Sequence, residues 1–173
     1  MRPDMRQGPE IWIRGPVPVP EAASPPPPVP APDGTRRFSW VGAHGGAGTT
    51  TLAEVYGGQD RGRRWPGPGE LASVLLVART HATGLAAAGR ALEAMNSRNS
   101  MTAMNAMNAP RALVLVADAP GRLPRPLAQR VRLLEASVDV HRVPWVPAWR
   151  LGDLTGAPPR GTESLARLTG AGR

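Results

Sequence analysis

Short runs of consecutive apolar residues alternate along the chain with segments in which apolar residues recur every three or four positions. Continuous runs of this length are typical of strands buried on both faces, and the wider spacing is typical of helices that bury one face. The runs predict strands at residues 38–42, 73–78, 112–117 and 138–143, and the spacing predicts helices at 49–56, 85–95, 124–136 and 161–170. Residues 59–70 show neither period and should form a loop.

This alternation predicts the fold class and the limits of the folded part. Strands separated by helices need crossover connections, so we expect an α/β domain with a mostly parallel sheet of about four to five strands and helices on both faces. The domain should span residues 35–156, and residues 157–173 should form a C-terminal tail with a short helix. Residues 1–34 hold 11 of the 21 prolines and should form a disordered Pro-rich arm.

Composition excludes several kinds of chemistry. The chain has no cysteine, which excludes disulfides, thiolate metal sites and cysteine nucleophiles, and its three histidines do not have metal-ligand spacing. No segment approaches the roughly 18 apolar residues that span a bilayer, and the N-terminus has no apolar signal core. We therefore expect a cytoplasmic protein without a membrane span. All basic residues are arginine and the formal charge is +8, which favours non-specific attraction to DNA or to acidic partners.

A glycine-rich turn follows the first predicted strand and leads directly into a predicted helix. A strand, a glycine turn and a helix N-terminus together aim several backbone N–H groups at one point, which is why phosphate binds at such turns. The hydroxyl of Thr50 would ligate magnesium in a turn of this kind. The candidate nucleotide-binding residues are Gly45, Gly46, Ala47, Gly48, Thr49, Thr50 and Thr51.

The turn resembles the deviant P-loop of the MinD/ParA-like ATPases, whose pattern is Lys-Gly-Gly-x-Gly-Lys-Ser/Thr-Thr. The matching positions are Gly45, Gly46, Gly48, Thr50 and Thr51. His44 stands where that family has its signature lysine, and Thr49 stands where active P-loops have the lysine that contacts phosphate. The resemblance implies a P-loop NTPase-like fold that binds ATP or another nucleoside triphosphate with magnesium. The chain contains no lysine, so only an arginine can replace the lost charge, and the candidates are Arg61, Arg63, Arg64 and Arg79.

Two alignments of the later segments with this family are open. In the first, residues 74–90 resemble its later strand and helix, residues 113–121 its penultimate strand, and residues 143–147 its final strand and the proline-containing loop near the base. The segment that carries the hydrolytic aspartate and the Walker B strand is then missing. In the second, Asp118 is itself the Walker B aspartate that holds magnesium. The candidate metal ligands are therefore Thr50 and Asp118.

Two further features follow predicted strands. His81 lies at the carboxyl end of the strand at 73–78, where we expect it to cap the next helix or to lie at the surface. Trp145 and Trp149 lie near Arg142 and Arg150, and core packing or an interface is favoured for them over stacking on a base.

These observations support one main function and two alternatives. Loss of the phosphate lysine argues against hydrolysis, so no catalytic residue is assigned and the chain is not expected to be an enzyme. The main hypothesis is a degenerate P-loop protein that acts as a non-hydrolysing nucleotide-binding or purely structural adaptor for a protein partner or in a homodimer. The alternatives are a basic nucleic-acid-associated protein of a plasmid or mobile element, and an active ATPase that uses an arginine or a partner's residue. A turn kept for packing alone, with no cofactor, is the opposing interpretation.

Overall fold

The computed structural model describes residues 38–67, 73–99 and 110–171, and the arm predicted at 1–34 lies outside these ranges. The described residues form a parallel five-stranded sheet in the order β2-β1-β3-β4-β5. The strands are β1 (Phe38–Gly42), β2 (Gln59–Asp60), β3 (Ser73–Arg79), β4 (Pro110–Val116) and β5 (Val140–Val143). The helices are α1 (Thr49–Tyr56), α2 (Ala82–Asn99), α3 (Arg125–Glu135), α4 (Pro147–Arg150) and α5 (Glu163–Thr169). The predicted α/β class with a parallel sheet is confirmed.

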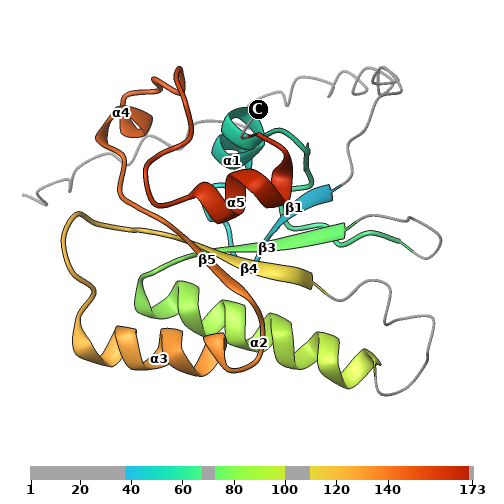
Figure 1. The fold of residues 1–173 in the computed structure, drawn as a ribbon. Coiled ribbons are helices and arrows are strands. Elements are labelled where there is room, and N and C mark those ends of the chain that lie inside the picture. The colour runs from blue at the N-terminus through green and yellow to red at the C-terminus, as the bar shows by residue number, and fades with distance from the viewer. Residues whose placement is uncertain (1–37, 68–72, 100–109, 172–173) are drawn as a thin grey trace, which may run out of the picture. The chain divides into compact units, whose positions relative to one another are not determined.

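Helices cover both faces of the sheet, as its continuous apolar strands require. Figure 1 shows α1 and α5 on one face and α2 and α3 on the other. The side chains of β3 alternate between the two resulting cores, with Leu75 and Val77 facing α1 and α5, and Leu76 and Ala78 facing α2 and α3. None of the helices in the described ranges combines the length and the apolar character needed to cross a membrane.

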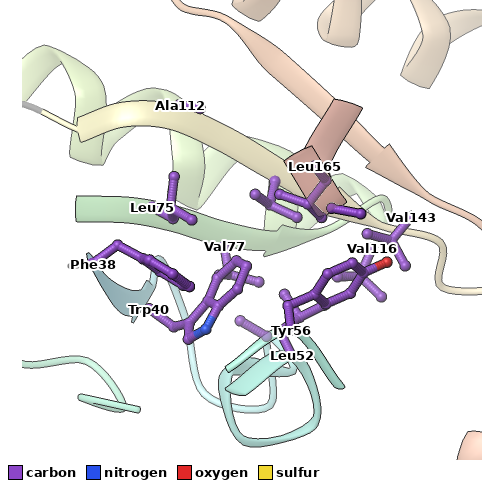
Figure 2. Close-up of a cluster of buried hydrophobic side chains, with 13 residues drawn as sticks. Phe38, Trp40, Leu52, Tyr56, Leu75, Val77, Ala112, Val116, Val143 and Leu165 are labelled. Atoms are coloured by element: carbon purple, nitrogen blue, oxygen red, sulfur yellow. The ribbon is translucent and has the colours of Figure 1, made fainter. Parts of the chain in front are cut away.

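The core beneath α1 is built around Trp40, whose side chain is fully buried. The ring of Phe38 meets the Trp40 ring edge-on, with centroids 5.4 Å apart, and Figure 2 shows Trp40 between Phe38 and Tyr56. The indole N–H of Trp40 donates to the carbonyl of Gly57, at 2.7 Å, so the buried polar atom has its partner. These contacts hold the start of β1 and the end of α1 together, and the glycine turn lies between them.

The C-terminal helix packs on the same core. Leu165 of α5 is fully buried there, and the Tyr56 hydroxyl donates to Oγ1 of Thr162 at 2.8 Å. Leu165 and Ala166, which lie in the segment after residue 156 that the sequence analysis assigned to a tail, therefore belong to the buried core beside α1.

The strand order places a switch point between β1 and β3. The chain leaves β1 through α1 and pairs β2 on one side, whereas it leaves β3 through α2 and pairs β4 on the other side. Ligands of open parallel sheets bind outside the carboxyl ends of the strands at such a point. The glycine turn follows β1 and His81 follows β3, so both lie at this edge.

Candidate functional site

The glycine turn is compact and open to the outside. Gly46 and Gly48 have positive φ angles of 72° and 104°, which glycine adopts without strain. A Cβ atom placed on Gly45 or Gly46 would meet no other atom within 4 Å. The backbone can therefore approach a ligand closely from that side.

Backbone hydrogen bonds anchor both ends of the turn. The Gly42 amide donates to the Gly62 carbonyl at 2.6 Å, the Ala43 amide donates to the Val77 carbonyl at 2.8 Å, and the first helical bond runs from Leu52 to Gly48 at 3.0 Å. Between these anchors, no acceptor among the described residues meets the amides of 44–51. The first N–H groups of a helix have no partner within it, and here the turn adds further free donors. The result is a cradle of N–H groups suited to an anion.

His44 holds this turn against the neighbouring strand. Its Nε2 accepts a hydrogen bond from the backbone amide of Arg79 at 3.0 Å, so the ring proton lies on Nδ1, which donates to the Gly45 carbonyl at 2.8 Å. The ring also lies beside that of His81, with centroids 5.1 Å apart. His44 therefore links the glycine turn to the end of β3.

His81 accepts a hydrogen bond from the Gly84 amide at its Nδ1, at 3.0 Å, and so caps the start of α2. The expectation that this histidine is a capping residue is confirmed.

Thr50 pairs with an aspartate that the sequence analysis did not select. Its hydroxyl donates to Oδ2 of Asp60 at 2.6 Å, and the Gly62 amide donates to Oδ1 at 2.8 Å. Burial raises the pKa of Asp60, but the hydrogen bonds from Thr50, the Gly62 amide and Thr49 outweigh it and bring that pKa below its usual value. The carboxylate beside Thr50 is therefore ionised at neutral pH.

Asp118, the aspartate that the sequence analysis paired with Thr50, lies after β4. Its backbone amide donates to Oγ1 of Thr80 at 3.0 Å, and β3 separates β4 from β1. No hydrogen bond joins Asp118 to Thr50 among the described residues, and no group of three or more His, Asp and Glu side chains in these ranges is arranged to hold a metal ion. The carboxylate next to Thr50 is thus that of Asp60.

Arg79 is the candidate arginine whose side chain reaches the glycine turn. Its Nη1 donates to the Ala117 carbonyl at 3.2 Å, and its Nη2 lies 3.7 Å from the Cβ position of Gly48. The side chain of Arg61 donates from Nε to Oγ of Ser39, on β1, at 3.2 Å.

A cavity of about 40 Å³ lies beside the turn. The residues that line it include Gly48, Thr51, Arg79, Val116, Trp145 and Arg150. The guanidinium carbon of Arg150 lies 4.6 Å from the centre of the Trp145 ring. Trp149 also lines the cavity and packs against the core beneath α1, so the interpretation of Trp149 as a packing residue is confirmed.

Comparisons with known proteins identify a family and no individual relative. Neither a curated protein nor a solved structure matches the chain. Residues 37–168, which are more than half of the chain, match a family described as a family of unknown function. The chain belongs to this family, DUF6668.

Proposed function

We propose that this domain binds a nucleoside triphosphate with magnesium, as a non-hydrolysing relative of the MinD/ParA-like ATPases. The observation that carries the proposal is that the backbone amides of residues 44–51, at the switch point of a parallel sheet, meet no acceptor in the described part of the chain. Free amides at a helix N-terminus attract phosphate because they combine hydrogen-bond donors with the positive end of the helix dipole. The first turn of α1 holds no acidic residue that would oppose such a ligand.

Thr50 and Asp60 fit the magnesium that accompanies nucleotide phosphates. Because the Thr50 hydroxyl donates its proton to Asp60, the lone pairs of Oγ1 are available to a cation. Magnesium at such sites keeps several waters and takes only one or two protein ligands besides the phosphates. Bound there, the ion would supply positive charge against the phosphate oxygens.

The residue at position 49 supports binding without turnover. Thr49 is buried and has no charge, so it cannot balance the negative charge that develops on a transferred phosphoryl group. A nucleotide that is bound and kept stabilises the folded state that binds it. The domain would then act as an adaptor in the cytoplasm, with the nucleotide as part of the surface offered to a protein partner.

Calorimetric titration with ATP and magnesium tests the proposal. We expect the wild-type protein to bind at millimolar concentration or below. Thr50→Val keeps the shape of the side chain and loses the hydroxyl, so it should weaken binding about tenfold in the presence of magnesium and leave binding of magnesium-free ATP unchanged. Thr155→Val is the matched control, because the Thr155 hydroxyl also donates to an aspartate, Asp153, at 2.6 Å, outside the site.

Two results would count against this function. If the wild-type protein shows no heat of binding at any ATP concentration, the turn is a packing element. Release of phosphate above the rate in buffer alone would instead favour the active ATPase.

A further inference from the structure

We propose that Arg79 supplies the positive charge that the glycine turn lacks at position 49, so that the turn and this guanidinium hold the nucleotide phosphates together. The inference rests on the proposed function. It names the group whose positive charge would replace that of the phosphate lysine in the P-loop of the MinD/ParA-like ATPases. It places the cation on β3, the neighbouring strand, instead of on α1.

The position of Arg79 is held by contacts from both sides. Its backbone amide donates to His44 at 3.0 Å, and the carbonyl of Ala117 accepts from Nη1 at 3.2 Å. These bonds set the end of β3 against the turn and tether one edge of the guanidinium. The other nitrogens, Nη2 and Nε, have no acceptor among the described residues, and Nη2 lies beside Gly48.

The charge of Arg79 has no ion-pair partner in the described part of the chain. The ion pair found there joins Arg142 to Glu135, at 2.6 Å, on another surface. Partial burial lowers the pKa of Arg79, the charge of Arg150 lowers it further, and Asp118 opposes both without forming an ion pair. A half-buried guanidinium close to a second one is unfavourable when no ion pair compensates its charge, because burial penalises an unpaired ion. An anion in the cavity between them would remove this penalty.

The dimensions of the cavity indicate which part of the ligand would occupy it. Pockets that enclose a drug-sized molecule measure roughly 300–1,000 Å³, whereas this cavity measures about 40 Å³. It therefore accommodates a single small group and leaves the nucleoside outside. Guanidinium groups recognise phosphate through paired N–H donors, so a phosphate group of the nucleotide is the chemistry that fits.

The alternative role for Arg79 is structural, as a tether between β3 and the loop after β4. Arg79→Gln tests the charge of Arg79, because glutamine keeps an N–H donor at the end of its side chain but is uncharged. Arg79→Lys keeps the charge. Arg130→Gln is the matched control, since Arg130 likewise donates from Nη1 to a backbone carbonyl, that of Ala82, at 3.3 Å, away from the turn.

The experiment is calorimetric titration of these variants with magnesium ATP and, separately, with inorganic pyrophosphate, with melting temperature as the check on folding. Arg79→Gln should weaken binding of both ligands about 10- to 100-fold, the range for a lost charge-assisted hydrogen bond. Arg79→Lys should retain most of the affinity, and Arg130→Gln should match the wild type. Adding Thr49→Lys to Arg79→Gln should restore binding, which a purely structural role for Arg79 does not allow.

The outcomes separate this inference from the function beneath it. If the wild type binds and Arg79→Gln binds equally well, the inference is wrong and the nucleotide site stands. If the wild type binds neither ATP nor pyrophosphate, both are wrong. If Arg79→Gln does not fold and Arg79→Lys does not bind, Arg79 acts as a structural tether and the inference is wrong.

Discussion

Substitution of Gly48 with aspartate is expected to abolish detectable binding of magnesium ATP, a loss of more than about 100-fold. The new carboxylate would stand at the mouth of the amide cradle and repel phosphate. Its Cβ would also lie 3.7 Å from Nη2 of Arg79, so the carboxylate could capture that guanidinium. A titration by calorimetry measures the loss.

Gly156→Asp is the control for backbone strain in that experiment. Gly156 has a φ of 107°, close to the 104° of Gly48, and open space around its Cβ position. Both variants incur the cost of a side chain in a left-handed conformation, about 1–2 kcal/mol. Gly156→Asp should bind ATP like the wild type, and equal binding by both variants would contradict the proposed site.

Gly84→Ala should destabilise the domain, although alanine is the better helix former. A Cβ on Gly84 would overlap the carbonyl oxygen of Arg79 and lie 3.0 Å from Nε2 of His44. The Cβ is fixed to the backbone of α2 and the carbonyl oxygen belongs to the backbone of β3, so no side-chain rotation can relieve the overlap. The helix α2 must therefore shift away from the end of β3. We expect a loss of about 1–3 kcal/mol in the free energy of unfolding, measured with urea.

The same substitution at Gly89 should have the opposite sign. Gly89 lies on the same helix, and a Cβ there would come no closer than 4.0 Å to another side chain, at Leu134. The helix then gains about 0.5–1 kcal/mol from the lower flexibility of alanine in the unfolded chain.

Gly84→Ala should also weaken ATP binding, because its clash disturbs the hydrogen bond between the Arg79 amide and His44. A stable Gly84→Ala variant would show that the turn and α2 are not rigidly linked.

The long elements could be predicted from the sequence because their signal is local. The runs around Leu75 and Val114 are continuous and apolar, and both faces of the strands that they form are buried. The prediction of a loop over 59–70 was wrong at Gln59–Asp60, which form β2. Two polar residues carry no apolar pattern, and they form a strand because the backbone of β1 pairs with them.

The geometry of the candidate site could be predicted in part for the same reason. The glycine turn is contiguous in the sequence, and its position after β1 follows from the neighbouring run. Asp60 could not be selected, because its contact with Thr50 depends on the pairing of β2 with β1. Arg79 was one of four arginine candidates, and only the adjacency of β3 to β1 brings its side chain to Gly48.

The most direct test of the phosphate cradle is amide NMR of the wild-type protein during titration with magnesium ATP and with pyrophosphate. If the N–H groups of the turn bind phosphate, the amide signals of Gly45, Gly46 and Gly48 should shift together to lower field and saturate with either ligand, while that of Gly156 stays in place. Unchanged glycine signals at saturating ligand would show that these amides do not receive an anion.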